Sequence, residues 1–452
     1  MVIAHFVTRI RNRLSDIDGQ TRSLLQGASL AFLLRGIGAG LAFLLSVVVG
    51  RLLGAEGTGL YFTALSVVSI GSVVARVGLD NTVLRFVAAG AANDDWGQVR
   101  GVFRLSLGLS ACIALGLGAL VLLFAPILSD RMFGNPDLAT SLRLMALGIL
   151  SFSMMTLLAE SLKGLQRVRN SMLVSGILYP LTALIVIWPL VRMFGPGGAG
   201  VSFVLGTGVS AMVGWWFWYR AMATHPTPAT PFPRNVLWAS CRPLWVMALV
   251  NRAILPWAPL FLLGFYASAA EAGIFGAATR VALLVSFFLL AVNTVLAPRF
   301  AALHQQGKVH AIARLSRRFA LFVTVAASPF FLMFIFAGDW VMGLFGPDFA
   351  AGGKVLAILA VGQLINALTG PVGVILMMGG QEKDLQTGSL VAVATLLILA
   401  FLLVPTMNAA GAAIASATAS IVTSVLATVF VWKRFGVIAL PLVPTSRKAG
   451  AE

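Results

Sequence analysis

Apolar residues occur along this chain in long blocks separated by short polar stretches. Twelve blocks of about 20 mostly apolar residues, the length that a helix needs to cross a membrane, are centred near residues 38, 70, 114, 150, 182, 210, 252, 285, 330, 366, 395 and 421. Gly or Pro interrupts several of them, which membrane helices tolerate because neighbours or water satisfy the freed backbone groups. Runs such as LVAVATLLILAFLLV (390–404) do not alternate apolar and polar positions, which excludes the strands of a β-barrel. The pattern predicts an all-α protein that crosses the membrane about twelve times.

Composition supports this class. Of the 452 residues, 59% are apolar and only 10% are charged, and the mean hydropathy is +0.94, whereas about a quarter of the residues in a soluble domain are charged. The start, MVIAHFVTRIRNRLSDIDGQ, carries charges where a signal sequence needs an apolar core, so we expect no cleavable signal peptide.

The net charge of +17 would suit a nucleic-acid-binding protein, but its distribution indicates a membrane protein. When the loops are numbered from a cytoplasmic N-terminus, 23 Lys and Arg fall on the cytoplasmic side and 5 on the other. The positive-inside rule therefore predicts that both termini are cytoplasmic. Attraction to anionic membrane lipids accounts for the basic excess, and we expect no nucleic-acid partner.

Residues that usually carry catalysis or bind metals are scarce. Cys112 and Cys241 belong to different predicted helices, and the four histidines lie in tails or loops, so neither a disulfide framework nor a metal site is expected. No Ser/His/Asp set, no paired carboxylates and no GxxxxGK[ST] nucleotide-binding loop is visible. The sequence predicts no enzyme and no cofactor, although coupling to protons or sodium ions is compatible with it.

The chain contains an internal repeat. NTVL occurs at 81–84 and again at 293–296, and Gly59-Leu60-Tyr61 is matched by Gly273-Ile274-Phe275. Further collinear matches, at offsets between 210 and 215 residues, pair GQVRGVFR (97–104) with GKVHAIAR (307–314), MFGNPDLA (132–139) with LFGPDFA (344–350), and GGAGVSF (197–203) with NAAGAAI (408–414). Each copy holds six predicted helices, an even number, so both copies have one orientation. They should be related by a pseudo-two-fold axis along the membrane normal.

A proline-rich stretch, HPTPATPFPR (225–234), separates the copies and is typical of a stiff, extended linker. We therefore expect five parts: a cytoplasmic tail (1–21), an N-lobe of helices 1 to 6 (22–222), a cytoplasmic linker (223–238), a C-lobe of helices 7 to 12 (239–433) and a second cytoplasmic tail (434–452). Two six-helix lobes with a cleft between them are a transporter layout.

Three stretches resemble bacterial polysaccharide flippases of the Wzx type, in the multidrug/oligosaccharidyl-lipid/polysaccharide exporter (MOP) superfamily. They are residues 24–88, from LLQGASLAFLLRGIGAG to DNTVLRFVA; residues 344–383, from LFGPDFAAGGKVLAIL to GGQEK; and AAGAAIASATAS at 409–420. The resemblance covers essentially the whole chain and implies a V-shaped fold of twelve helices. It also implies a location in a bacterial inner membrane and a substrate, an oligosaccharide on a polyprenyl diphosphate carrier, which is moved to the periplasmic leaflet for cell-surface polysaccharides such as O-antigen, lipopolysaccharide or exopolysaccharide. Lipid II flippases of the MurJ type are similar too, but usually carry two additional helices.

Four arginines fall inside predicted spans, namely Arg35, Arg76, Arg252 and Arg280. An arginine in mid-bilayer costs about 2.5–3.5 kcal/mol on insertion scales, so these side chains should face water, a partner or an anionic ligand. Arg35 and Arg252 are at mid-depth in helices 1 and 7, which are equivalent in the repeat. We expect them to converge on the cleft, where a diphosphate would accept charge-assisted, bidentate hydrogen bonds.

Structural roles compete with this interpretation. Arg76 and Asp80 are four residues apart on one predicted helix and can neutralise each other, and Arg280 is near enough to a membrane surface to extend toward it. Glu160 can pair with Lys163. Asp80 and Glu160 are also the candidates for proton or sodium coupling, because intramembrane carboxylates often have that role.

Uncharged polar residues give a weaker indication of the substrate site. Asn293, Gln363 and Asn366 can bind sugars, and equally can form hydrogen bonds between helices. Gln363 and Asn366 are three residues apart and share a helix face.

The sequence favours a flippase that works by alternating access, with other glycan-assembly membrane proteins as possible partners. A drug exporter of the same superfamily would carry mostly cations, which an arginine-lined cleft repels. A membrane polymerase or ligase would need catalytic groups on a large periplasmic loop, and the longest such segments, near 125–140 and 337–353, contain no histidine. A non-catalytic scaffold for a glycan-assembly complex is a further alternative.

Overall fold

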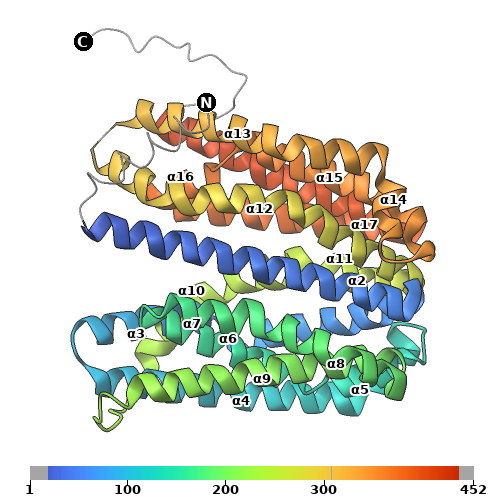
Figure 1. The fold of residues 1–452 in the computed structure, drawn as a ribbon, viewed down its shortest axis with the longest axis horizontal. Helices are drawn as coiled ribbons and strands as arrows, with labels where there is room; N and C mark the ends of the chain where they lie inside the picture. Colours follow the sequence, from blue (N-terminus) through green and yellow to red (C-terminus); the bar gives the residue numbers. More distant parts are fainter. Residues whose placement is uncertain (1–18, 307, 437–452) are drawn as a thin grey trace, which may run out of the picture.

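The computed structural model describes the backbone of residues 19–306 and 308–436, and the side chains of these ranges except residues 19–32 and part of 287–310. The described residues form a bundle of long helices that run side by side (Figure 1). The predicted tails, 1–21 and 434–452, lie almost wholly outside the described residues.

We call residues 19–222 the N-terminal half and residues 234–436 the C-terminal half. The N-terminal half contains α2 (Gly19–Arg76), α3 (Leu79–Ala92), α4 (Trp96–Ile127), π-helical η1 (Leu128–Met132), α5 (Leu138–Met145), α6 (Gly148–Gly164), α7 (Val168–Met172), π-helical η2 (Leu173–Leu178), α8 (Tyr179–Phe194) and α9 (Pro196–Met222). The C-terminal half contains α10 (Arg234–Ala248), π-helical η3 (Leu249–Ile254), α11 (Leu255–Tyr266), α12 (Ala269–Gln305), α13 (Val309–Phe336), α14 (Gly338–Gly343), 3₁₀-helical η4 (Pro347–Gly352), α15 (Gly353–Thr369), α16 (Val372–Met378) and α17 (Glu382–Phe435).

Nine helices in the described residues are long and apolar enough to cross a membrane, or ten if α5 and α6, bent by 41°, form one span. Two of them, α2 and α17, are each long enough to cross the membrane twice. At about 1.5 Å per residue, the 58 residues of α2 and the 54 of α17 far exceed the ~30 Å of hydrocarbon. Each folds back at one non-helical residue, Gly54 (φ 65°) in α2 and Asn408 (φ 48°) in α17. Counting each as two spans gives the twelve that the hydrophobic pattern predicts.

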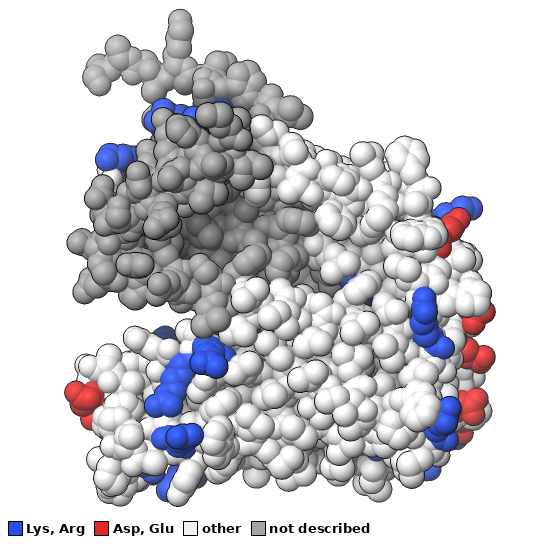
Figure 2. All heavy atoms as spheres, in the orientation of Figure 1, with Lys and Arg blue, Asp and Glu red and all other residues white. Residues whose placement is uncertain are grey.

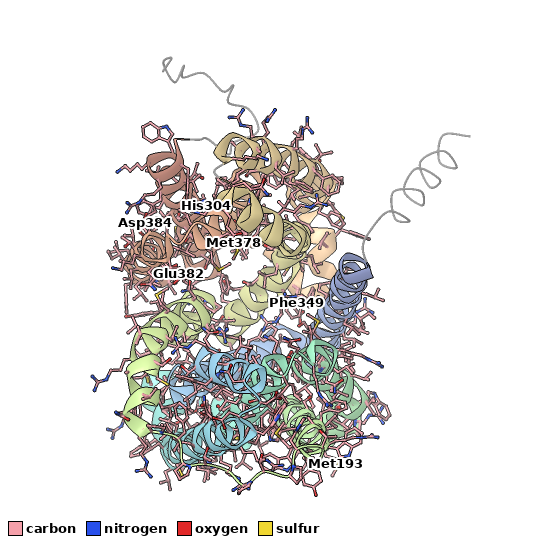
Figure 3. The ribbon with its side chains drawn as sticks, turned by 90° about the vertical axis from the view of Figure 1, so that its left-hand side faces the viewer. Met193, His304, Phe349, Met378, Glu382 and Asp384 are labelled. Carbon is pink, nitrogen blue, oxygen red and sulfur yellow. The ribbon has the colours of Figure 1, made fainter. Side chains whose placement is uncertain are left out.

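On the part of the face that Figure 2 draws in colour, charged side chains gather toward the two ends of the bundle, with a broad, nearly uncharged band between them. Figure 3 looks along the bundle from the left-hand end of Figure 1; Asp384 and Glu382 of α17 lie in one half and Met193 of α8 in the other. The band is the part of the surface that hydrocarbon would solvate, because charges are costly there.

The largest apolar core of the described residues is shared by the two halves and lies at one end of the bundle. The largest cluster of buried side chains includes Phe62 and Met145 from the N-terminal half with Phe275 and Phe345 from the C-terminal half. Toward the other end there are two separate clusters: one around Leu79, to which α10 also contributes, and one around Phe300 in the C-terminal half. The halves are therefore closed against each other at the end where α2 turns at Gly54.

A pair of repeat-related contacts holds this closed end. Gly59 of α2 packs so tightly on α12 that a Cβ atom would overlap the carbonyl of Ala269, and one on Gly273 would overlap the carbonyl of Ala55. Gly273 is the repeat counterpart of Gly59, and Ala269 is that of Ala55, each at an offset of 214 residues. The two contacts are therefore equivalent. Such reciprocity is what a two-fold axis produces, so a pseudo-two-fold axis passes between α2 and α12.

The segment between the halves is attached to the N-terminal half. The backbone N–H of Thr230 donates to the carbonyl of Gly97 (3.1 Å), and the ring of His225 stacks on Trp96 at 3.6 Å. Arg100 donates to the carbonyls of Met222 and His225, each at 2.8 Å. The following helix, α10, begins at Arg234, inside the predicted linker range, and its Leu237 and Cys241 belong to the apolar cluster of the N-terminal half.

Candidate functional site

Two cavities adjoin each other and share part of their lining. The first, of about 610 Å³, lies between the halves, with walls from α2, α6, α8 and α9 on one side and α11, α12 and α15 on the other. The second, of about 540 Å³, lies inside the C-terminal half between α11, α12, α15 and α17. Four residues line both cavities: Trp257, Arg280, Leu283 and Asn366. Arg280 is the charged side chain at this junction.

Aromatic rings lie close to the guanidinium group of Arg280. Its Cζ lies 4.0 Å from the ring centre of Phe62 and 5.9 Å from that of Trp257, distances at which a cation is attracted to a ring face. NH1 donates to the carbonyl of Gly276 at 3.1 Å. The buried hydroxyls of Tyr61 on α2 and Tyr179 on α8 interact with each other and electrostatically with Arg280. Among the described residues Arg280 has no acidic partner, so its charge is available to a ligand.

The second cavity is rich in neutral hydrogen-bonding groups. Eight of its lining residues carry a hydroxyl or an amide: Asn251, Thr279, Gln363, Asn366, Ser416, Ser420, Thr423 and Ser424. Aspartate and glutamate are absent from the described lining of both cavities. Hydroxyls and amides both donate and accept, as polyhydroxylated ligands require, and Trp257 adds a flat apolar surface.

Two predicted sugar-binding residues lie at these cavities and also join helices. Ser286 of α12 donates to the amide oxygen of Gln363, and Ser424 of α17 donates to that of Asn366 at 3.4 Å. The bond to Asn366 is long and therefore weak. Both roles considered for these amides are thus compatible with their positions, whereas the side chain of Asn293, on α12, lies outside the described residues.

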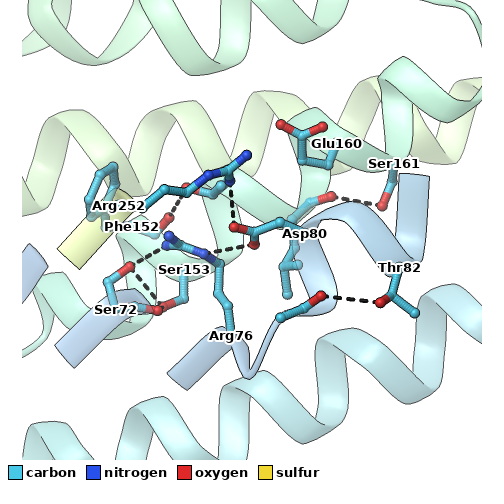
Figure 4. Close-up of polar contacts among 12 residues, drawn as sticks. Ser72, Arg76, Asp80, Thr82, Phe152, Ser153, Glu160, Ser161 and Arg252 are labelled. Atoms are coloured by element: carbon cyan, nitrogen blue, oxygen red, sulfur yellow. Dashed lines mark hydrogen bonds and ion pairs between the residues drawn. The ribbon is translucent and has the colours of Figure 1, made fainter. Parts of the chain in front are cut away.

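Arg76, Asp80 and Arg252 form a cluster of charges (Figure 4). One carboxylate oxygen of Asp80 lies 2.8 Å from Nε of Arg76, and the other lies 2.6 Å from NH1 of Arg252. The Arg76–Asp80 contact is an ion pair whose angle is poor for a hydrogen bond. Both of its side chains are only 4% exposed, while Arg252 is 41% exposed. The buried carboxylate of Asp80 is thus paired with two guanidinium groups, and this pairing offsets the cost of burying the charges of Arg76 and Asp80.

The expectation that Arg76 and Asp80 share one continuous helix is wrong. α2 ends at Arg76, and Val77 (φ 46°) and Gly78 (φ 74°) are left-handed before α3 begins at Leu79. A left-handed β-branched residue such as Val77 is rare and strained. The break brings Gly78 against α10, where a Cβ would lie 2.6 Å from the backbone nitrogen of Trp245 and 2.7 Å from the carbonyl oxygen of Cys241. It also places Asp80 in the first turn of α3, where a helix dipole favours negative charge.

Arg35 and Glu160 have separate surroundings. Arg35 is exposed on α2, one helical turn before Ala39, which lines the first cavity, so the two share a face of the helix. Arg252 is bound to Asp80 instead, and the described contacts do not join Arg35 to Arg252. Glu160, 11% exposed, pairs with Lys163 at 2.8 Å, one of the two roles considered for it.

Sequence reasoning did not identify most residues around Arg280. Tyr61, Phe62, Tyr179 and Trp257 come from three helices, and single aromatic residues in apolar blocks give no signal of a shared site. One signal was present in α17. Ser416, Ser420, Thr423 and Ser424 recur at helical spacing and form one polar face in an otherwise apolar span.

Comparison with known proteins agrees with this architecture. Residues 24–304 match the family model described as polysaccharide biosynthesis protein, which covers more than half of the chain. The stage V sporulation protein B of Bacillus subtilis (strain 168) is 22% identical over 426 residues, which cover 85% of this chain and 79% of that protein.

Solved structures give the same fold. An inward-facing multidrug resistance MATE family transporter of the MOP superfamily superimposes with a TM-score of 0.71 at 14% identity, over 90% of this chain and 98% of that one. The lipid II flippase MurJ, in an inward closed conformation, gives a TM-score of 0.68 at 15% identity, over 89% and 87%. These likenesses confirm the expected all-α, multi-span fold. The chain belongs to the polysaccharide biosynthesis protein family and has the fold of the membrane transporters of the MOP superfamily.

Proposed function

We propose that this protein is a flippase that moves a polyprenyl-diphosphate-linked oligosaccharide from the cytoplasmic to the periplasmic leaflet. The observation that carries the proposal is the position of Arg280. It lies at the junction of two cavities, without an acidic partner among the described residues, next to a chamber lined with hydroxyls and amides. In this assignment the diphosphate binds Arg280, the sugars occupy the second cavity and the lipid tail remains in the membrane.

The sign of the charge supports an anionic substrate over a cationic drug. Each hydrogen bond from a guanidinium to a phosphate contributes about 1.5–3 kcal/mol, which offsets the ~2.5–3.5 kcal/mol cost of an intramembrane arginine. A cation in the same cavity would meet Arg280 with no carboxylate on the described lining to compensate. Lipid II is a diphosphate lipid of similar chemistry, so a MurJ-like lipid II flippase is the alternative that this site accommodates.

Transport would proceed by alternating access of two lobes, 22–222 and 239–433, joined through the linker 223–238, with both termini in the cytoplasm. The shared apolar core at the Gly59–Ala269 contact would close the periplasmic end in the present conformation. Substrate would then enter from the opposite end, past Arg35. Asp80 and Glu160 stay candidates for ion coupling, and Asn293 a candidate for sugar binding.

The test is a flip assay in proteoliposomes that carry a fluorescent polyprenyl-diphosphate oligosaccharide, compared with lipid II and with a cationic dye in separate experiments. We expect transport of the oligosaccharide lipid by wild type, loss in Arg280→Gln and partial activity in Arg280→Lys, which keeps the charge but not the planar fork. Arg143→Gln, at an exposed position on α5, is the matched control. Full activity of folded Arg280→Gln would refute the site, and transport of the dye alone would refute the substrate class.

A further inference from the structure

A separate cavity, of about 460 Å³, lies between α4 and α10 and shares no lining residue with the two central cavities. One wall comes from α4 and the other from α10; the lining residues are Arg104, Leu105, Gly108, Leu109, Cys112, Arg234, Leu237 and Trp238. The proposed flippase mechanism makes no use of this cavity. We therefore ask which other ligand its lining residues could bind.

Two arginines give the cavity its charge. Arg104 lies in the third turn of α4 and Arg234 at the start of α10, and both are exposed. Neither forms an ion pair or a hydrogen bond within the part of the chain that the structure describes, and no described lining residue is acidic. Two uncompensated guanidinium groups in one cavity are complementary to a phosphate, which each can bind bidentately.

An apolar, lipid-facing track leads away from the arginines. Gly108, Cys112 and Gly116 are four residues apart on one face of α4, and a Cβ on either glycine would meet no atom within 4 Å. The same face continues to Leu120 (51% exposed) and Phe124 (48% exposed). Exposed large apolar side chains on a membrane-spanning helix face hydrocarbon, so this track borders the bilayer rather than the central cavities.

The length of the track matches one leaflet. From Arg104 to Gly116 the helix rises about 18 Å at ~1.5 Å per residue, and half of the hydrocarbon core is about 15 Å. Trp238, 39% exposed, stands beside the arginines, and tryptophan is enriched at the level of lipid headgroups. The two arginines, the interfacial tryptophan and the apolar track therefore follow one another in the order of the phosphate, the headgroup boundary and the acyl chain of a phospholipid.

We propose that this cavity binds one anionic phospholipid, with its phosphate between Arg104 and Arg234 and an acyl chain along Gly108, Cys112 and Gly116. The lipid lies at the end of the bundle that holds the linker, which the positive-inside distribution predicts to be cytoplasmic. It is a bilayer lipid and not the transported substrate, because the described lining of the cavity has no hydroxyl or amide set to hold sugars.

The protein carries its own probe of this site. Of the two cysteines, Cys112 is exposed on the track and Cys241 is buried, so a membrane-soluble maleimide reports on Cys112. The full chain is placed in nanodiscs of phosphatidylcholine with increasing phosphatidylglycerol, and the rate of alkylation is measured. We expect phosphatidylglycerol to slow alkylation in wild type, and the half-protecting fraction to rise about tenfold in Arg104→Gln/Arg234→Gln.

Controls separate a site from general effects of charge. Arg169→Gln, at another exposed arginine at the same end of the bundle, should behave as wild type. Arg104→Lys/Arg234→Lys should keep most of the protection, which makes the result independent of any folding defect in the glutamine variant. The proposal fails if phosphatidylglycerol gives no protection, or if the glutamine variant is protected equally. It fails too if glycerol phosphate alone protects, or if a polyprenyl phosphate protects and phosphatidylglycerol does not.

Discussion

Oδ2 of Asp80 lies 2.6 Å from NH1 of Arg252, and this ion pair crosses from α3 of the N-terminal half to η3 of the C-terminal half. The same carboxyl group is 2.8 Å from Arg76. One carboxylate is thus shared by two cations, so the three side chains carry a net charge of +1. Substitutions that change this balance should differ in their effects according to which charge they leave unpaired.

Asp80→Asn should be the most destabilising substitution in this cluster. It leaves Arg76, which is 4% exposed, without its counter-charge, and an unpaired buried charge costs about 3–5 kcal/mol. Arg252→Gln should cost less, because Arg252 is 41% exposed and the Arg76–Asp80 pair survives it. Thermal unfolding in detergent measures both. Asp80→Asn/Arg76→Gln should recover part of the loss, and a double variant no more stable than Asp80→Asn would contradict the pairing.

Gly78→Ala should destabilise the break between α2 and α3 by about 1–3 kcal/mol. Gly78 has a left-handed backbone (φ 74°), and a methyl group there would lie within 3 Å of Trp245 and Cys241 backbone atoms. Gly40→Ala is the matched control, because no atom lies within 4 Å of a Cβ at that position. Denaturation of the two variants should separate them; equal stability would show that the break tolerates a side chain.

Gly273→Val should open the closed end of the bundle, because a larger side chain cannot fit against the backbone of Ala55. Thr279→Cys, on the wall of the second cavity, reports on this opening through its reaction with an impermeant maleimide added at the closed end. We expect faster labelling in Gly273→Val than in the parent cysteine variant. Gly208→Ala, at a position with free space around it, should leave the rate unchanged. An unaltered rate in Gly273→Val would mean that the contact does not control access.

Asn366→Asp should weaken binding of an anionic substrate more than Asn366→Gln does. The aspartate would add a carboxylate to the cavities that Arg280 lines, where it competes with a phosphate for the guanidinium. A change of about 1.4 kcal/mol or more corresponds to at least a tenfold rise in the substrate Kd. Titration of a polyprenyl-diphosphate lipid into the detergent-purified variants measures this Kd. An unchanged affinity in Asn366→Asp would show that the phosphate does not bind in this cavity.

The fold could be predicted from the sequence because its signals are long-range averages. Twelve apolar blocks and a repeat at nearly constant offset depend on many residues each, so local irregularities do not hide them. The cluster around Asp80 illustrates the opposite case. Whether Arg76 and Asp80 lie on one helix depends on two left-handed residues, Val77 and Gly78, and a β-branched valine gives no hint of that conformation.

Arg252 shows a second limit. Its depth in helix 7 indicated an intramembrane arginine, but not that η3 turns it toward Asp80, 172 residues earlier in the chain. Arg280 could be singled out by its type and position. Its two cavities could not, because their walls come from α2, α6, α8, α9, α11, α12, α15 and α17, and no local pattern reports how helices from both halves meet.

The reciprocal packing of Gly59 on Ala269 and Gly273 on Ala55 has a consequence for the ancestry of the chain. If a single six-helix gene preceded the duplication, its product would have met a second copy of itself through this surface. One mutation would then have changed both contacts at once. After fusion each contact could be altered alone, and charge could be assigned separately, as with Arg280 in one copy and Asp80 in the other. Duplication and fusion would thus have allowed the two identical subunits of a symmetric dimer to become two unlike halves of one chain.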